Sequence, residues 1–152
     1  MIVLSRIDNR LVHGQVIEAW LPHLKVLRLV VADAEAAGDP LARAAMGMAL
    51  PPQVKMLVAP VEAVDFAALA TDAVPTLVLF RDVPAVLAAR AHGLPDGDLN
   101  VGNVHGGPGR EPLSQTVYLS GEERAQLASL EQGGMEVFLQ AVPSEKKVHL
   151  PN

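Results

Sequence analysis

Short apolar runs alternate with helix-forming segments along this chain, and this alternation is the feature that most restricts its fold. Residues 2–7 form the first run, and residues 26–32 are nearly all apolar, as in a strand buried on both faces. Residues 15–21 have a helical pattern that we expect to end near Pro22. Further strands are predicted at residues 53–58, 76–80, 99–101, 116–119 and 135–142, and further helices at residues 39–50, 61–70, 84–91 and 120–133.

Strands that alternate with helices are typical of α/β proteins. We therefore predict a single domain, residues 1–152, built as an open, doubly wound, mainly parallel β-sheet with helices on both faces. The Gly/Pro-rich connection over residues 102–115 has no helical pattern, so some late strands are expected to be antiparallel. In the helix over residues 39–50, Met46 and Met48 are expected to fill the core.

The composition excludes several classes of protein. Half of the 152 residues are apolar, which excludes a disordered chain. The absence of cysteine excludes disulfides, thiolate metal sites and a cysteine nucleophile. The 12 basic and 17 acidic residues give a net charge of −5 without any basic block, which is atypical of nucleic-acid binding.

The sequence shows no targeting or membrane-spanning segment. The first apolar run ends at Arg6, too early for the core of a signal peptide, and no apolar stretch reaches the roughly 18 residues that a membrane span needs. We therefore expect a cytoplasmic protein whose membrane association comes only through partners.

A short loop after the first predicted strand combines an arginine, a histidine and a glycine in residues 10–15 (RLVHGQ). In open α/β sheets, ligands bind beyond the carboxyl ends of the strands, where the start of the next helix attracts anions. Arg10 offers a planar fork of donors to phosphate oxygens, His13 is a nucleophile, and Gly14 permits close approach. Asp8 could orient the imidazole or fix the loop by binding backbone N–H groups. These residues predict a site for a phosphoryl group.

A second segment, residues 100–107 (NVGNVHGG), follows a later strand and includes His105. It either lines the same sheet edge or is a flexible connection whose glycines form turns. Two further alternatives remain open: His13 could be an ordinary surface group, and Asp8, His13 and His105 could hold a metal in a hydrolase. The glycines of residues 102–109 do not match a P-loop, and we predict no cofactor and no metal.

Three motifs, spread from the first strand to the tail, resemble those of one known family. Residues 6–16 (RIDNRLVHGQV) match the stretch Arg-Ile-Asp-x-Arg-Leu-x-His-Gly-Gln-Val. Residues 100–102 leading to His105 are a second match, and residues 136–143, followed by Lys146-Lys147, are a third. The chain thus resembles the IIB component of mannose/fructose/sorbose-type phosphotransferase systems over essentially its whole length.

The resemblance implies an open α/β fold and the activity of a protein-Nπ-phosphohistidine–sugar phosphotransferase. The histidine at the position of His13 would accept a phosphoryl group from a phosphohistidine of the IIA component. It would then donate the group to a sugar carried by the membrane components IIC and IID. Arg10 is expected to bind the phosphoryl oxygens, with Asp8 in a supporting role. The supporting loops would include Asn9, Gly14, Gly102 and His105.

This sequence departs from the family pattern at three places. Asn9 stands where an acidic residue is frequent, Asn103 and Val104 stand where glycine and methionine precede the histidine, and residues 32–33 are Ala-Asp instead of Asn-Asp. The departures leave Arg10 and His13 in place, so they bear on sugar specificity and partner fit. As an alternative, the chain is a regulatory phosphoacceptor in a phosphorelay without sugar transport.

Overall fold

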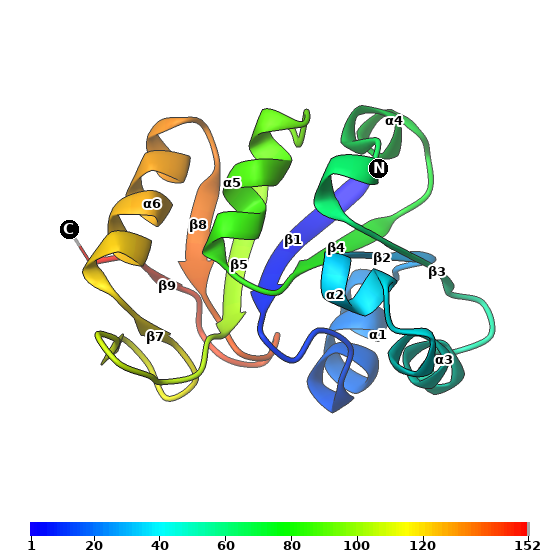
Figure 1. Ribbon diagram of the computed structural model, residues 1–152, viewed down its shortest axis with the longest axis horizontal. Coiled ribbons are helices and arrows are strands. Elements are labelled where there is room, and N and C mark those ends of the chain that lie inside the picture. Colours follow the sequence, from blue (N-terminus) through cyan, green and yellow to red (C-terminus); the bar gives the residue numbers. More distant parts are fainter. Residues whose placement is uncertain (152) are drawn as a thin grey trace.

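The computed structural model describes residues 1–151 as an α/β fold with helices on both sides of a central sheet (Figure 1). The sheet has the strand order β3-β2-β4-β1-β5-β8-β9. Neighbouring strands are parallel except for β8 and β9, which are antiparallel. The strands are β1 (Ile2–Asp8), β2 (Arg28–Ala32), β3 (Lys55–Ala59), β4 (Thr76–Phe80), β5 (Asp98–Asn103), β8 (Glu136–Leu139) and β9 (Val148–His149).

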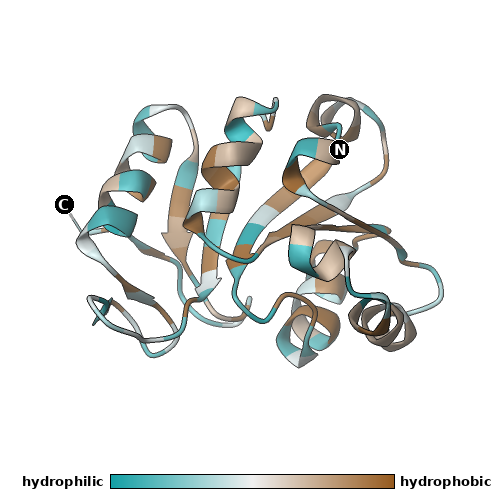
Figure 2. Ribbon diagram, viewed as in Figure 1, coloured by the Kyte–Doolittle hydropathy of each residue, from teal (hydrophilic) through white to brown (hydrophobic). Residues whose placement is uncertain are grey.

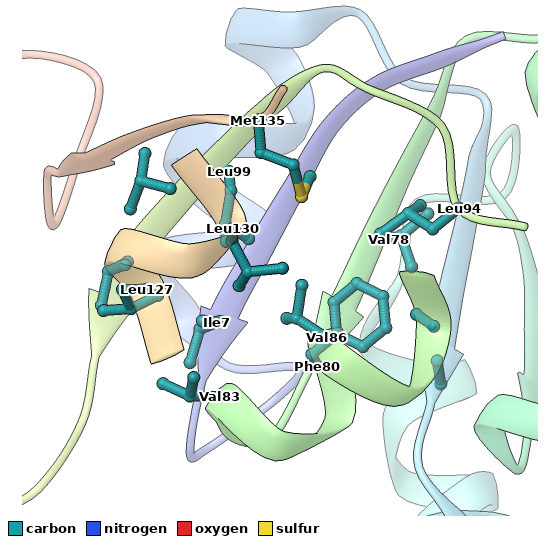
Figure 3. Close-up of a cluster of buried hydrophobic side chains, with 14 of the residues drawn as sticks. Ile7, Val78, Phe80, Val83, Val86, Leu94, Leu99, Leu127, Leu130 and Met135 are labelled. Carbon is teal, nitrogen blue, oxygen red and sulfur yellow. The ribbon is translucent and has the colours of Figure 1, made fainter. Parts of the chain in front are cut away.

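Alternate strand residues pack into two cores, one on each face of the sheet. Val30 and Ala32 of β2 belong to one core, and Leu29 and Val31 belong to the other. Figure 3 shows part of the first core, in which side chains from the helices gather over the strands. That core is covered by α4 (Phe66–Thr71), α5 (Val83–Ala91) and α6 (Gly121–Gln132). The second is covered by η1 (Gln15–Trp20), α1 (Leu21–Leu24), α2 (Ala34–Ala37) and α3 (Pro40–Ala49). The predicted doubly wound, mainly parallel sheet is confirmed.

Several helix ends follow local sequence signals. Asp39 caps α3, because its side chain accepts hydrogen bonds from the backbone N–H groups of Leu41 and Ala42. Ser120 and Glu123 form the capping box that opens α6. Capping satisfies backbone donors that have no partner within the helix, so these boundaries are determined locally.

The helix after β1 does not end at Pro22, contrary to the expectation. The wide turns of η1, a π-helix, lead directly into α1, and Pro22 lies in the first turn of α1. Pro22 thus lies at the junction of the two helices, within a continuous helical run. The chain leaves the helix at Lys25, which adopts a left-handed conformation (φ 54°).

The region between β5 and α6 also differs from the expected strand over residues 116–119. Only β7 (Tyr118–Leu119) is a strand there, and it pairs antiparallel with β6 (Glu111–Pro112) outside the main sheet. The antiparallel pairs are β6 with β7 and β8 with β9, which agrees with the expectation that some late strands are antiparallel. The helix α6 provides the crossover that keeps β8 parallel to β5. No helix within residues 1–151 is long and apolar enough to cross a membrane.

Two short elements and one methionine were not as expected. The sequence pattern gave no sign of α2 or β9, and the predicted helix over residues 61–70 is a 3₁₀ turn, η2 (Val61–Ala63), followed by α4. Asp65 caps α4 by accepting from the backbone N–H of Ala68, which places the start of α4 after η2. Met46 is half-buried, but Met48 is 87% exposed because residues two apart point to opposite sides of a helix.

Candidate functional site

The loop that follows β1 lies at the carboxyl edge of the sheet, between β1 and β5. Asp8 ends β1 and is paired in register with Asn103, which ends β5. After β1 the chain crosses to the face covered by η1, whereas after β5 it reaches the face covered by α6. Such a divergence is a topological switch point, where open α/β sheets leave a crevice for ligands. The fold therefore places residues 9–14 where a ligand can approach.

Asp8 binds both the histidine and the loop. Its Oδ2 lies 2.6 Å from Nε2 of His13, and its Oδ1 accepts the backbone N–H of Arg10 at 3.0 Å. Asp8 is fully buried, whereas the His13 side chain is 14% exposed. The buried Leu11 adopts a left-handed conformation (φ 56°), and its N–H donates to the backbone oxygen of Asp8. Both roles that the sequence allowed for Asp8, imidazole orientation and loop fixation, are present in this geometry.

A buried arginine that sequence reasoning did not place in the site lies beneath Asp8. Nε and Nη2 of Arg6 donate to Oδ2 of Asp8 at 3.2 and 3.1 Å, and Nη1 donates to the side chain of Asn100 and to the backbone oxygen of Gln140. The guanidinium carbon lies 5.1 Å from the centre of the Trp20 ring. The sequence signal that could have revealed this role was Arg6 itself, a charged residue inside an apolar strand. A buried charge requires partners, which must come from elsewhere in the fold.

The second glycine-rich segment reaches the site through Gly102 and Asn103. A Cβ atom on Gly102 would overlap the Arg6 guanidinium, so this position leaves the space that Arg6 occupies. Nδ2 of Asn103 donates to Oδ2 of Asp8 and to Oε1 of Gln15, both at 2.9 Å. Asn103, which departs from the family pattern, therefore belongs to the network that holds Asp8.

The electrostatics of this network keep Asp8 ionised. Burial by itself raises the pKa of Asp8, but hydrogen bonds from His13, Asn103 and the Arg10 backbone, together with the positive charge of Arg6, outweigh burial, so the pKa lies below the ordinary value. Burial lowers the pKa of the Arg6 guanidinium, while the contact with Asp8 opposes that shift. A negative carboxylate beside Nε2 favours the histidine tautomer with a proton on Nε2, which leaves the Nδ1 lone pair available.

The other residues named from the sequence lie around this network in different ways. The side chain of Arg10 is exposed, and Gly14 is also exposed. Asn9 is half-buried, and its N–H donates to the backbone oxygen of Asn103. His105 is exposed, and its backbone oxygen accepts from Arg110.

The structure contains no ligand set for the metal-hydrolase alternative. Within residues 1–151, no three or more histidine, aspartate or glutamate side chains form a group that could hold a metal ion. Asp8 and His13 are in contact, but His105 does not complete a cluster with them. The arrangement instead presents one oriented imidazole in a loop that also carries the exposed Arg10.

The comparisons with known proteins identify the family of this chain. The family model of the PTS system sorbose subfamily IIB component matches residues 2–152. The chain belongs to this family. It is 33% identical to the N-acetylgalactosamine-specific phosphotransferase enzyme IIB component 2 of Escherichia coli, over 98% of this chain and 96% of that protein.

Two further comparisons extend the family assignment. The crystal structure of the N-acetylgalactosamine-specific IIB component 1 from E. coli superposes with a TM-score of 0.91 at 30% identity, covering 99% of this chain and 100% of that one. The mannose-specific EIIAB component of E. coli is 26% identical over 99% of this chain, which matches 47% of that longer protein. As a IIB component, this protein is a phosphotransfer module in sugar uptake, so the purely regulatory alternative is not favoured.

Proposed function

We propose that His13 carries the phosphoryl group, as a protein-Nπ-phosphohistidine–sugar phosphotransferase requires. The contact between Nε2 of His13 and the buried Asp8 carboxylate is the observation that carries this proposal. The carboxylate fixes the ring, holds the proton on Nε2 and leaves Nδ1 (Nπ) as the nucleophile. Asp8 thereby acts as the positioning group that a nucleophilic histidine needs.

The transfer takes place in two displacements at phosphorus. In the first, the Nδ1 lone pair forms a bond to phosphorus while the nitrogen–phosphorus bond of the donor phosphohistidine breaks and its electron pair returns to the donor imidazole. In the second, a sugar hydroxyl oxygen attacks phosphorus and its proton passes to water, while the bond between phosphorus and Nδ1 of His13 breaks and its electron pair returns to Nδ1. Each step needs in-line geometry and stabilisation of the charge on the three equatorial oxygens.

Arg10 and the start of η1 supply that stabilisation. Arg10 is exposed, and its backbone is fixed by Asp8 only three residues before His13. Its guanidinium offers donors that match phosphoryl oxygens. The backbone N–H groups of residues 14–16 lie before the first helical bond, which runs from the N–H of Ile17 to the backbone oxygen of His13, and they can donate to the same oxygens. The supporting loops hold these donors in place.

The partners follow from the family role. The phosphoryl donor is a IIA component that carries a phosphohistidine, and the acceptor is a sugar held by the membrane components IIC and IID. The E. coli mannose-specific relative is an EIIAB component, which supports an A-type partner for this B-type chain. The protein acts at the cytoplasmic face of the membrane, which it reaches through the membrane components.

Phosphorylation by purified components tests the proposal. Phosphoenolpyruvate, the general phosphotransferase proteins and IIA should label the protein with acid-labile phosphate, mapped under conditions that preserve phosphohistidine. His13→Ala should abolish the label, and circular dichroism should show that its fold is retained. If His13→Ala still accepts acid-labile phosphate from phospho-IIA, the assignment of His13 is wrong.

The second half-reaction requires a separate assay. Phosphorylated protein mixed with membranes that contain IIC and IID should lose its phosphate and form a sugar phosphate. A protein that accepts phosphate on His13 but yields no sugar phosphate with any tested sugar would instead act as a regulatory phosphoacceptor.

A further inference from the structure

Gln15, two residues after His13, has a side-chain amide whose orientation is fixed by its neighbours. Its Oε1 accepts from Nδ2 of Asn103 at 2.9 Å, and Nη2 of Arg6 lies 3.5 Å from the same oxygen. A guanidinium has donors and no acceptor, so the oxygen of the Gln15 amide must face it. The amide nitrogen of Gln15, Nε2, therefore points away from the buried network.

The ionised carboxylate of Asp8 determines these orientations. A carboxylate without a proton only accepts hydrogen bonds, so Asn103 must turn its Nδ2 group toward Oδ2 of Asp8, which lies 2.9 Å away. The second N–H of the same Nδ2 group then reaches Oε1 of Gln15. Asn103 is only 6% exposed, so water competes little for these bonds. The charge of Asp8 thus decides which end of the Gln15 amide faces outward.

The outward end of the Gln15 amide is a free donor. In the part of the chain that the structure describes, every buried side-chain nitrogen or oxygen has a hydrogen-bond partner, whereas Nε2 of Gln15 has none. This nitrogen is therefore open to solvent, although the residue as a whole is half-buried. A donor that is held in place before a ligand arrives needs no reorganisation when the ligand binds.

The side chains of Gln15 and His13 are attached to one buried oxygen. Oδ2 of Asp8 lies 2.6 Å from Nε2 of His13 and 2.9 Å from the Asn103 amide that holds Gln15. Figure 2 shows teal bands along β1 within a mainly brown sheet, so this polar network begins inside an apolar environment. Nδ1 is the ring nitrogen of His13 that is not bound to Asp8. The nucleophilic nitrogen and the free amide donor therefore both lead outward from Asp8 at the same edge of the sheet.

We propose that the side-chain amide of Gln15 donates a hydrogen bond to the phosphoryl group on His13, and that Asn103 is the positioning residue that aims this amide. The inference rests on the proposed function, because it requires a phosphoryl group on Nδ1. Gln15 supplies a neutral donor to the phosphoryl oxygens, whereas Arg10 supplies a charged one. A neutral donor binds a phosphoryl group less tightly than a second cation would, which suits a group that must be passed on.

Two variants of Gln15 separate its donor role from its acceptor role. Gln15→Glu keeps oxygens that accept from Asn103 and Arg6 but removes the N–H donors, and Gln15→Met removes both without adding charge. Phosphorylation of His13 should slow at least about tenfold in each variant, the factor that one hydrogen bond to a charged group contributes. The loss should be similar with phospho-IIA and with the small donor phosphoramidate, because the amide contacts the transferred group itself. Gln132→Glu and Gln132→Met are matched controls, since the exposed Gln132 ends α6 at the opposite edge of the sheet.

NMR of the side-chain amides provides a second, independent measurement. In protein with ¹⁵N-labelled glutamine, the N–H₂ signal of Gln15 should shift on phosphorylation of His13 and become protected from exchange with water. The signal of Gln132 should not change. In Asn103→Ala, which no longer holds the amide of Gln15, this protection should be lost. Full protection in Asn103→Ala would show that Asn103 does not aim the amide.

The other outcomes would each overturn the donor role of Gln15. Parental rates in both Gln15 variants would do so directly. A slow Gln15→Met beside a parental Gln15→Glu would show that Gln15 acts only as an acceptor, and the reverse pattern would indicate repulsion by the added charge. Two slow variants without any change in the parent's Gln15 amide signal would assign the loss to altered packing. If the parent accepts no phosphate on His13, the proposed function itself is refuted, whereas the outcomes above leave it standing.

Discussion

Two aspartates at the same edge of the sheet show how similar local positions acquire different roles. Asp8 ends β1 and Asp33 directly follows β2, and each carboxylate binds an arginine. Asp33 is 12% exposed and caps the short helix α2, whereas Asp8 is fully buried and binds the side chain of His13. The pKa of each lies below the ordinary value, because hydrogen bonds outweigh burial in both cases.

The difference arises from position in the sheet. Asp8 lies at the switch point between β1 and β5, so side chains from two directions converge on it. Asp33 follows β2, which β4 separates from β1 in the sheet. Its carboxylate binds the start of α2 and the side chain of Arg81, which follows β4. A carboxylate at the end of a strand thus belongs to a candidate site when it orients a nucleophile. It has a structural role when it only caps a helix and forms an ion pair.

The largest expected difference in stability is between variants of Arg6, which binds Asp8, and Arg81, which binds Asp33. Arg6→Leu should lower the free energy of unfolding by about 3–5 kcal/mol, because it leaves the buried Asp8 charge without its partner. Arg81→Leu removes a half-exposed pair and should cost only about 0–1 kcal/mol. Urea unfolding monitored by the single tryptophan would measure both values. Equal losses of unfolding free energy in the two variants would show that the Arg6–Asp8 pair stabilises the fold no more than the Arg81–Asp33 pair.

A smaller effect is expected at Gly102. Gly102→Ala places a Cβ atom where the Arg6 guanidinium lies, so the guanidinium must shift away from Asp8. Overpacking of this kind costs about 1–3 kcal/mol. Phosphoryl transfer to His13 should also slow, even from phosphoramidate. Gly107→Ala is the matched control, because a Cβ atom at Gly107 meets open space. A Gly102→Ala protein with parental stability and parental rate would contradict the packing of Arg6 against this glycine.

Loss of the Asp33 carboxylate should affect stability but not chemistry. Asp33→Ala removes the cap of α2 and should cost about 0.5–2 kcal/mol. His13 should still accept phosphate from phosphoramidate at the parental rate, because Asp33 makes no contact with the Asp8 network among the described hydrogen bonds. A marked fall in that rate would show that the two aspartates belong to one functional unit.

The smallest expected effect lies in the pH dependence of stability. A carboxylate with a lowered pKa in the folded state stabilises the protein fully above its unfolded pKa, about 3.9, and this stabilisation is lost as the pH falls through the folded pKa. The parent should therefore lose stability below about pH 4. Asp33→Asn should lose less over the same range in urea titrations at successive pH values. An identical acid slope in the variant would rule out Asp33 as a contributor.

Sequence reasoning predicted the fold and the loop after β1 because both depend on local signals. The strand at residues 76–80 and the cap of α3 at Asp39 are determined by short apolar runs and capping residues. The loop was predictable because parallel strands present their carboxyl ends at one edge. The sequence allowed a contact between Asp8 and His13, which lie only five residues apart, and left open whether Asp8 orients the imidazole or fixes the loop.

The remaining features depend on contacts between distant parts of the sequence. Arg6 binds Asn100 and the backbone of Gln140, which lie 94 and 134 residues further along the chain, so no local pattern assigns it to the site. The exposure of Met48 was also unforeseen, because an alanine- and methionine-rich helix resembles a core helix when its neighbours are unknown. Strand pairing and helix neighbours, which decide both cases, are tertiary properties.

The central claim is that Asp8 holds Nε2 of His13, so that Nδ1 receives the phosphoryl group. The most direct measurement is NMR of the phosphorylated protein with ¹⁵N-labelled histidine, in which phosphorus–nitrogen coupling identifies the bonded atom. The account predicts coupling to Nδ1 of His13 and none in the His13→Ala variant. A phosphoryl group on Nε2 of His13, or on another histidine, would contradict it.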